Sequence, residues 1–504
     1  MTLKCSKKFS CPKKTCWIPF SFFICGICSL RGSTWSRNHM FSKELISKGM
    51  KELDVIQEIK CVGTRVTHRS CIFTNVTLYT KSNTLKIGIY VPDNMNLLEV
   101  LKIRNIPGQC AFSGCGIVIP GPNPDRVNQR EVVWQLQIEK KQTNFTTLNS
   151  KCFLDKPVVV WKQYRHNNFG HMIPDNLLAL YVALLNLNNY YFNHELILVN
   201  DCFESEVWTE KSRNNCKRMQ HMYYSLFHKV TYLKNKIQDG CSVINFSKLF
   251  IGGGGFGMFH YGTMAAEDFL YTSTNQLVTS KLSGNKGISY YTNLFRQTVM
   301  DNYGVSKHQS KEPLNKIIFV NKTSSNNLDL KFGNRAINNI EKLMKELPKK
   351  FASEVKFSSE NFLTDFRSQV VTLKDTSVLI TPYGGVGYGA IFLPDHSTLI
   401  RIEIPCGGYP KSFKGNDLDF YSFMGYLSHI NVLFYKIENS EELLIRGNKE
   451  HSKQALNIFN KCKECLEQKR KCALFNERIY QSDYNLDSDK ITKMLKLALR
   501  HSSS

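Results

Sequence analysis

The sequence of 504 residues lacks several patterns that identify common protein classes. It contains no convincing internal repeat or low-complexity tract, which argues against a structural or adhesion protein built from an array of modules. It has no G-x-S-x-G elbow and no persuasive Cys/His nucleophilic pair, so nothing predicts an enzyme of those classes. Zinc-finger and RNP-type motifs are missing as well. What is present is a globular composition, with 42% hydrophobic and 12% aromatic residues.

Acidic residues are also scarce, because 42 Asp and Glu stand against 66 Lys and Arg, and the formal net charge is +24. A strongly basic protein commonly binds nucleic acid. Here the basic residues are dispersed and no nucleic-acid motif accompanies them, so we expect no nucleic acid partner. The charge suits nucleotide-sugar diphosphates, anionic membranes or glycans, and much of it is expected to be solvated surface.

No run at the N-terminus reaches the roughly 18 apolar residues expected of a full membrane span. The run Trp17–Leu30 is shorter and follows the stretch Met1–Lys14, which has five Lys and no acidic residue. This pattern predicts a cytosolic basic tail at 1–16, a signal anchor at 17–30 and a stem at 31–60. A cleaved signal peptide, which needs only about 7–15 apolar residues, is the alternative. Both predict a translocated body, and the anchor predicts a single-pass type II protein of the endoplasmic reticulum or Golgi membrane.

Two further patterns favour a lumenal location. Of the 17 Cys, 12 follow the apolar run, and an even number suggests disulfides in an oxidising compartment. Cys462-x-x-Cys465, with Cys472, lacks a fourth ligand at finger spacing, so a disulfide is favoured there over zinc. Four N-glycosylation sequons are present, at Asn75, Asn144, Asn245 and Asn321.

Short β-branched runs alternate with helical patterns through most of the body. We predict strands at 72–79, 86–91, 132–138, 158–161, 196–200, 316–320, 351–355, 378–381 and 398–404, and helices at 174–187, 338–347 and 362–370. A linker or interdomain helix is predicted within 280–313. The alternation predicts two doubly wound α/β lobes, an N-terminal one at 61–300 and a C-terminal one at 301–440, before charged helices at 441–504.

The segment 377–404 places a glycine-rich turn between two of these strands. Its glycines include Gly384, Gly385, Gly387 and Gly389. They remove side chains, so a ligand can approach the backbone closely. If a helix begins near Gly387, its free N–H groups and positive dipole end form a seat for a diphosphate. The alternative is that the turn only packs a helix on the sheet.

A polar cluster at 166–176 lies between a strand ending at Trp161 and the helix predicted from Pro174. Ligands of open α/β sheets bind outside the carboxyl ends of the strands. His171 and Asp175 are four residues apart and would share one face of a helical turn. The carboxylate would then fix the imidazole tautomer and make a general base. Alternatively, His171 only caps or packs this turn.

Three motifs in order, NFGHMIPDNL, GNRAINNIE and ITPYGGVGYGAIFLPDHSTLIRIEI, resemble those of glycosyltransferase family 61 over roughly 61–404. That family includes lumenal transferases of N-acetylglucosamine to protein-linked Ser/Thr or O-mannose, and plant xylosyl- and arabinosyltransferases. The resemblance implies an inverting mechanism on a GT-B fold. In that fold two Rossmann-like lobes face a cleft, and the C-terminal lobe binds most of the donor nucleotide.

The resemblance also implies roles for single residues. Asn168, His171 and Asp175 would face the acceptor, with His171 or Asp175 as the catalytic base. Arg335 would clamp the donor phosphates, and Glu403 would accept a hydrogen bond from a ribose hydroxyl or serve a structural role. The implied donor-binding set is Arg335, Asn338, Tyr383, Gly384, Gly385, Gly387 and Glu403.

Two positions depart from the family pattern. Tyr383 stands where many members have His, and Asn321–Lys322 follow a strand where many members have Arg. A tyrosine donates a hydrogen bond without a charge, and a lysine is a point charge without the guanidinium fork. These departures favour an alternative function, a catalytically inactive lumenal glycan-binding or scaffold protein of the same fold.

No metal site is expected. Asp417-Leu418-Asp419 has the Asp-x-Asp form of a metal-bound sugar-nucleotide site, but such triplets are frequent by chance. Gly252–Gly257 lacks the acidic partner of a dinucleotide fingerprint, so packing or flexibility is favoured. The sequence thus predicts a hexosyl- or pentosyltransferase that needs no cofactor. It would use a UDP-sugar as donor and move N-acetylglucosamine or xylose to a protein or glycan hydroxyl.

Overall fold

The chain divides into two compact units, Met1–Glu58 and Ile59–Ser504, and the computed structural model describes parts of the second. The described residues are 59–62, 70–81, 84–89, 96, 98–99, 115–118, 133–140, 152–161, 163, 170, 172–186, 194–199, 202, 210–251, 286–305, 315–322, 335–362, 365–382, 384–404, 427–445, 449–467, 477–480 and 482–502. The predicted tail, anchor and nearly all of the stem lie outside them. Within them, no helix is long and apolar enough to cross a membrane.

The first sheet is mixed and has ten strands. They are β1 (Ile59–Val62), β2 (Ser70–Tyr79), β3 (Thr84–Ile89), β4 (Cys115–Val118), β5 (Val133–Lys140), β6 (Phe153–Leu154), β7 (Val158–Trp161), β8 (Glu195–Leu198), β9 (Lys229–Tyr232) and β10 (Val243–Ile251). The main order is β4-β5-β3-β2-β10-β7-β8-β9, with β1 beside β2 and β6 beside β10. β1 begins inside the range predicted as stem.

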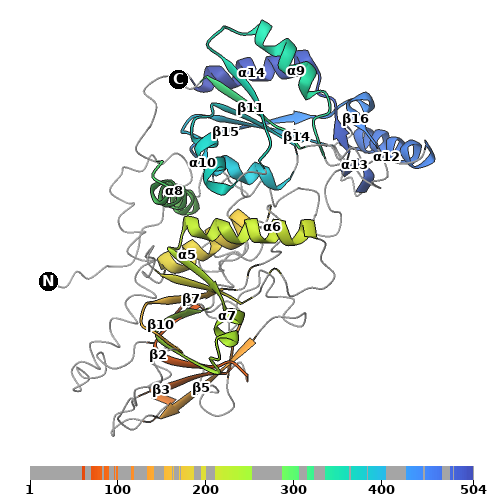
Figure 1. Ribbon diagram of the computed structural model, residues 1–504. Coiled ribbons are helices and arrows are strands. Elements are labelled where there is room, and N and C mark those ends of the chain that lie inside the picture. Colours follow the sequence, from red (N-terminus) through yellow and green to blue (C-terminus); the bar gives the residue numbers. More distant parts are fainter. Residues whose placement is uncertain are drawn as a thin grey trace, which may run out of the picture. The chain divides into compact units, whose positions relative to one another are not determined.

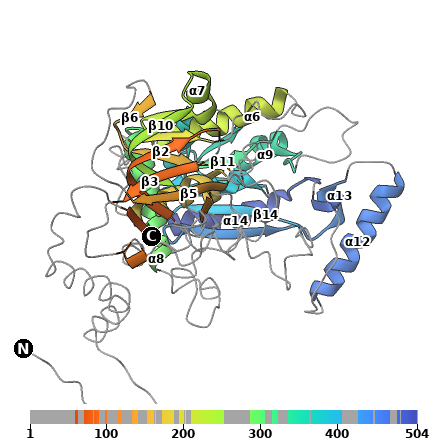
Figure 2. The ribbon, with the colours of Figure 1, turned by 90° about the horizontal axis from the view of Figure 1, so that it is seen from below.

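Only part of this sheet is built as a doubly wound lobe would be. β10, β7, β8 and β9 run parallel to one another. β2 runs antiparallel to β1, β3 and β10, and Figure 2 shows β10, β2, β3 and β5 following one another across the sheet. The sequence patterns therefore predicted β2, β3, β5, β7 and β8 but not β1 or β9, and the doubly wound arrangement predicted for this lobe is wrong for the antiparallel part.

Helices, some buried and some largely exposed, accompany the parallel part of the first sheet (Figure 1). They are η7 (Met172–Leu178), α5 (Ala179–Asn186), α6 (Glu210–His221), η8 (Met222–Ser225) and α7 (Leu233–Gln238). The predicted helix at 174–187 is found, but it begins at Met172 as one π-helical stretch before α5. Pro174 lies in the first turn, where its missing N–H removes no helical hydrogen bond.

Disulfides tie loops to this sheet. The bonded pairs are Cys152–Cys241 and Cys202–Cys216, and Cys71 and Cys462 are disulfide-bonded as well. The predicted disulfide at Cys462 is thereby confirmed.

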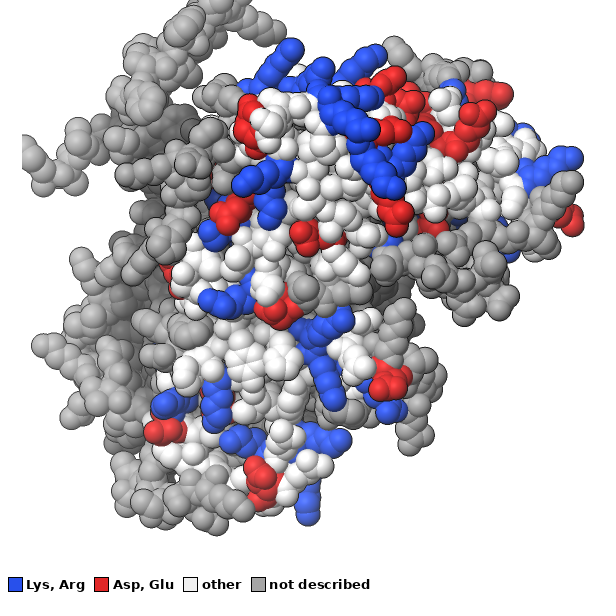
Figure 3. Space-filling view, turned by 45° about the horizontal axis from the view of Figure 1, so that its top comes forward, with Lys and Arg blue, Asp and Glu red and all other residues white. Residues whose placement is uncertain are grey.

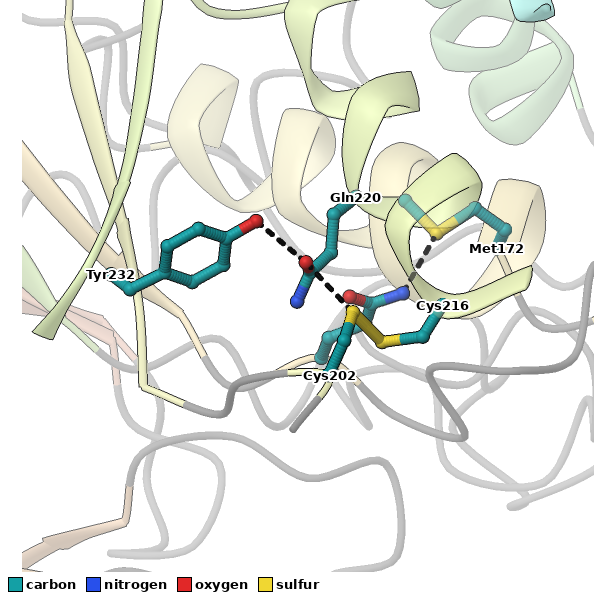
Figure 4. The surroundings of a disulfide bond; sticks show 6 residues. Met172, Cys202, Cys216, Gln220 and Tyr232 are labelled. Carbon is teal, nitrogen blue, oxygen red and sulfur yellow. Dashed lines mark hydrogen bonds between the residues drawn. A yellow bond between two sulfur atoms is a disulfide. The ribbon is translucent and has the colours of Figure 1, made fainter. Parts of the chain in front are cut away.

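The surroundings of the Cys202–Cys216 bond are buried and polar (Figure 4). The Cys202 sulfur lies 2.9 Å from Gln220 Oε1, a close contact only, since a disulfide sulfur carries no hydrogen. The Tyr232 hydroxyl donates a hydrogen bond to the same oxygen at 2.6 Å. This network fixes the loop that follows β8 against α6.

We expect the two disulfides to stabilise the fold unequally. Cys152–Cys241 spans 89 residues and Cys202–Cys216 spans 14. Loop-closure entropy then predicts that the C152S/C241S variant loses about 1–2 kcal/mol more free energy of unfolding than C202S/C216S. Denaturant unfolding of both variants measures the difference. Equal losses, or a larger loss for the short loop, would contradict it.

The second sheet is wholly parallel and has five strands. They are β11 (Lys316–Val320), β12 (Lys356–Glu360), β13 (Val378–Thr381), β14 (Thr398–Glu403) and β15 (Asn431–Lys436). Their order is β12-β11-β13-β14-β15. The chain therefore moves from β11 to one side for β12, then crosses over to β13 and continues on the other side. The topological switch point lies between β11 and β13.

Helices cover both faces of this sheet, as predicted for a doubly wound lobe (Figure 1). α10 (Phe366–Lys374) and η12 (Gly385–Phe392) pack with Ile318 and Leu379 on one face. α9 (Ile340–Glu346) and α14 (Ser488–Ser502) pack with Ile317 and Ile380 on the other. Adjacent strand residues thus enter opposite cores, which explains why the strands read as continuous apolar runs.

The strands predicted at 158–161, 316–320 and 378–381 match β7, β11 and β13 at both ends. The strand predicted at 351–355 is wrong. Those residues follow η11 (Leu347–Lys350) in a turn, in which the Val355 N–H donates to the Ala352 carbonyl at 3.1 Å. The edge strand β12 starts at Lys356 and is half-buried, so its sequence KFSSE carries little apolar signal.

Helix α8 (Lys286–Asn302) falls in the predicted interdomain segment and contacts elements of both halves. The Tyr181 and Thr298 hydroxyls are 2.7 Å apart. Asn302 Nδ2 donates to the Ser225 carbonyl at 2.8 Å, and Arg296 Nη1 pairs with Asp395 Oδ1 at 2.7 Å. The C-terminal elements are η13 (Ser440–Glu442), β16 (Leu443–Leu444), α12 (Lys449–Glu467), α13 (Glu477–Tyr480) and β17 (Asp483–Tyr484).

The surface shown in Figure 3 carries Lys and Arg interspersed with Asp and Glu among its described residues. This arrangement agrees with the dispersed charge of the sequence and with the view that much of the excess is solvated surface.

Candidate functional site

The candidate site lies at the topological switch point of the second sheet. Lys322 comes two residues after β11, and Gly384 comes three residues after β13. β11 and β13 are hydrogen-bonded neighbours. Loops at the carboxyl ends of two such strands leave the sheet in opposite directions, which opens the crevice in which open α/β sheets bind their ligands.

The glycine turn has a backbone that other residues adopt with difficulty. Gly384 has φ +135° and ψ −172°, a combination essentially restricted to glycine. The element after the turn begins at Gly385 and is a 3₁₀ helix, not an α-helix beginning near Gly387. The Gly387 N–H donates to the Gly384 carbonyl at 3.1 Å. That N–H is therefore used within the turn and is not available to a diphosphate.

Two cationic side chains converge on this turn. A Cβ placed on Gly384 would lie 3.0 Å from Lys322 Nζ and 3.3 Å from Arg335 Nη1. Lys322 arrives from the end of β11, and Arg335 arrives from the segment before α9 with a left-handed φ of 58°. Such a backbone is unusual for a residue other than glycine and often marks a functional position.

The electrostatics of Lys322 follow from this crowding. Burial of the ammonium group, together with the positive charge of Arg335, lowers the pKa of Lys322 to about 7. The carboxylate of Asp483 acts in the opposite direction and raises that pKa. An anionic ligand beside the ammonium would favour its charged form further, so the site is suited to a phosphate group.

Two further predicted donor residues, Asn338 and Glu403, contact other parts of the chain. Asn338 Nδ2 donates to Asn485 Oδ1 at 3.2 Å, so its amide contacts the C-terminal part of the chain. Glu403 ends β14, one strand beyond β13, and its carbonyl accepts from the Ile437 N–H at 2.9 Å. Roles for both residues in donor binding stay predictions. Tyr383 lies outside the described residues.

The predicted acceptor side lies near the end of β7. Asn168 and His171 are outside the described residues, and the backbone of Asp175 lies in η7. The start of η7 is held to the end of β7 by Gln163 Nε2, which donates to Met172 Sδ at 3.4 Å. Asn176 Oδ1 accepts from Trp161 Nε1 at 3.4 Å in the same buried region. π-helical segments are frequent at functional sites, and this one carries Asp175.

The glycosylation sequons differ in accessibility. Asn75 and Asn321 are half-buried, on β2 and directly after β11. Asn245 is only 8% exposed, and its Oδ1 accepts a hydrogen bond from Thr77 Oγ1 at 2.8 Å. This burial argues against a glycan on Asn245. Asn144 lies outside the described residues.

Metal ligands do not gather in the described part of the chain, where no group of three or more His, Cys, Asp or Glu side chains could hold an ion. Asp417 and Asp419 lie outside it.

Sequence reasoning treated Lys322 as a departure from a pattern, and the structure brings it together with Arg335 and Gly384. Its position directly after a buried strand was the signal that could have marked it. Asp483 was missed because it belongs to no motif and lies far along the chain from both cations.

Sequence comparison with protein families points to the same region. The family described as Glycosyltransferase 61 matches residues 89–400, more than half of the chain. The chain belongs to glycosyltransferase family 61. The match covers β11 to β13, Arg335, the glycine turn and the first half of β14, and it confirms the resemblance seen in the motifs. Comparison with curated proteins found no matching sequence.

Membership of family 61 makes sugar transfer the activity class that this site has to explain. The matched range ends within β14, so β15, β17 and α14 lie beyond it although they belong to the same fold.

Proposed function

We propose that this chain is a membrane-anchored lumenal glycosyltransferase of the endoplasmic reticulum or Golgi. It moves a sugar, N-acetylglucosamine or xylose, from a UDP donor to a hydroxyl of a protein or glycan, with inversion at the anomeric carbon. The proposal is carried by the convergence of Lys322 and Arg335 on Gly384 at the switch point of a parallel sheet.

The leaving diphosphate defines what the site has to do. Negative charge accumulates on the diphosphate as the bond to the anomeric carbon breaks, and nearby fixed cations stabilise it. The guanidinium of Arg335 can donate two parallel hydrogen bonds to phosphate oxygens, and Lys322 adds a compact charge. Gly384 lets the phosphates approach the backbone because it has no side chain. These groups replace a metal ion in this proposal, so no cofactor is required.

The acceptor hydroxyl needs a base on the other side of the sugar. In a single displacement, its oxygen bonds to the anomeric carbon from the face opposite the departing diphosphate. Its proton passes to a nearby side chain as the new bond forms. His171 or Asp175 is the proposed base, and Asn168 is proposed to contact the acceptor.

Stabilisation by UDP tests the donor site. We expect the purified full-length chain to gain about 2.7 kcal/mol of unfolding free energy when UDP is present at 100 times its dissociation constant. Lys322→Met should lose most of this gain, whereas Lys350→Met, which removes an ion pair with Asp489, should keep it. Thermal unfolding with UDP, GDP, ADP and CMP gives the readout. If no nucleotide stabilises the chain and no UDP-sugar is turned over, the proposal fails.

An inactive glycan-binding protein is the second candidate, and Tyr383 in place of the family's usual His is the feature that favours it. The second departure, Asn321–Lys322 where many members have Arg, favours this candidate less, because the Lys322 ammonium lies beside the glycine turn. UDP binding without turnover of any UDP-sugar, with or without glycan acceptors, would favour this second function.

A further inference from the structure

A C-terminal segment outside the family match runs alongside the residues that follow Arg335. The Ala336 N–H donates to Asp483 Oδ1 at 2.9 Å, and the Ala336 carbonyl accepts from the Tyr484 N–H at 2.8 Å. The Asn338 N–H then donates to the Tyr484 carbonyl at 2.7 Å. Ile337 and Tyr484 thereby form a parallel β-bridge. The backbone after Arg335 is thus held by residues almost 150 positions away.

A second set of bonds locks the same register. Asn339 Nδ2 donates to the Leu486 carbonyl at 2.8 Å, and the Leu486 N–H donates back to Asn339 Oδ1 at 3.0 Å. Such a reciprocal amide–backbone pair leaves little freedom to slide. The segment 336–339 is therefore positioned mainly by residues 483–486 and only afterwards enters α9.

Asp483 has a role besides its hydrogen bond to Ala336. Its carboxylate is only 1% exposed. A buried carboxylate is costly unless positive charge and donors surround it. Here the Ala336 N–H binds one oxygen, and the positive charge of Lys322 interacts with the group. The Asp483 side chain thus binds the peptide N–H that directly follows Arg335 and also interacts with the positive charge of Lys322.

We propose that Asp483 is a positioning residue of the donor site, which holds the backbone beside Arg335 and supplies a negative charge that favours the ammonium form of Lys322. This inference rests on the proposed function, since it assigns a partner to the two cations that would hold the donor diphosphate. It extends that site to a part of the chain beyond residues 89–400, which the family match does not cover.

The charge relationship predicts a pH profile. The pKa of Lys322 is lowered to about 7, so the ammonium is present below that pH and is lost as the pH rises through it. A diphosphate binds the ammonium more tightly than the amine, so UDP affinity should fall over the same range. Among the described residues, Arg335 lowers this pKa and Asp483 raises it. Removing the carboxylate should therefore move the fall in affinity to lower pH.

The test is a UDP titration of the full chain by calorimetry at a series of pH values, with Asp483→Asn as the main variant. Asn keeps an oxygen acceptor for the Ala336 N–H but removes the charge. We expect a pH midpoint about one unit lower, with UDP affinity about fivefold weaker at pH 7 and about tenfold weaker well above it, because one unit of pKa corresponds to a factor of ten in the protonation equilibrium. Asp483→Glu should restore much of the affinity. Asp489→Asn, an exposed carboxylate of α14, should behave as wild type.

A double variant separates positioning from loss of fold. In a Lys322→Met background the fall in affinity near pH 7 should be absent, and Asp483→Asn should cause little further loss, whereas a merely structural role would still lower the affinity at every pH. If Asp483→Asn binds UDP with wild-type affinity and midpoint, the inference is overturned while the proposed function stands. If the wild-type chain binds no nucleotide, the proposed function fails. In that case the rate at which an amine-reactive reagent labels Lys322, followed against pH by mass spectrometry, decides the inference. An unchanged labelling midpoint in Asp483→Asn then overturns it.

Discussion

Gly384→Ala is expected to abolish UDP binding, with affinity falling by at least about 100-fold, which corresponds to about 2.7 kcal/mol. Two effects combine. The new Cβ would stand 3.0 Å from Lys322 Nζ and 3.3 Å from Arg335 Nη1, so both cations must shift by a few tenths of an ångström, and the methyl group takes the space that a phosphate would use. The backbone at φ +135° would also be strained by about 1–3 kcal/mol with any side chain. UDP titration of the purified variant, beside its unfolding curve, measures both consequences.

Gly389→Ala, in the 3₁₀ helix that follows Gly384, provides a matched control. A Cβ on Gly389 would meet only Leu373 Cδ1, at 3.2 Å, the movable end of an apolar side chain. We expect a small change in stability and unaltered UDP affinity. If Gly384→Ala bound UDP as tightly as Gly389→Ala does, the glycine turn would not be the donor site.

Arg335→Ala is expected to lower the rate of sugar transfer by about 10²–10³-fold, the range measured when one preorganised donor to a developing negative charge is removed. Arg335→Lys should recover only part of the rate, because the ammonium cannot bind two phosphate oxygens in parallel. Since Ala and Lys tolerate the left-handed backbone at φ 58° about equally, the comparison isolates the guanidinium. The measurement is kcat and kcat/KM with the donor established by a UDP-sugar screen.

His171→Ala gives the contrast that assigns the two sides of the reaction. Loss of a base should lower transfer while UDP stabilisation is kept, whereas Arg335→Ala should lose both. Wild-type rates in both variants would contradict the assignment of the whole site.

The second sheet shows how far local sequence determines this fold. β11 and β13 are short β-branched interior strands, with a strand on each side and both faces covered. Their sequence patterns predicted the first and last residue of each strand correctly. β12 is an edge strand with half-buried polar residues, and the apolar pattern instead marked the turn before it. The antiparallel pairing of β2 with β10 was also beyond local reasoning, because the two strands are far apart in the chain.

The candidate site divides in a similar way. Gly384 was predicted from the glycine turn, and Arg335 from its resemblance to a family motif. That Lys322 joins them follows from the order of the strands, which places the ends of β11 and β13 side by side. Asp483 acts across 147 residues of sequence through one hydrogen bond, and no local pattern signals such a partner.

Helix α14 has a consequence for biogenesis. Its residues Ile491, Leu495 and Ala498 are fully buried in the core that also contains Ile317 and Ile380 of the parallel sheet. That face of the sheet cannot be closed until residues 488–502 have been synthesised, whereas all the strands of the first sheet precede residue 252. Domains generally fold in the order in which they are made. The first sheet can therefore form while the chain is still being made, whereas the parallel sheet keeps an open apolar face until α14 is complete, and chaperones would meet the chain in that state.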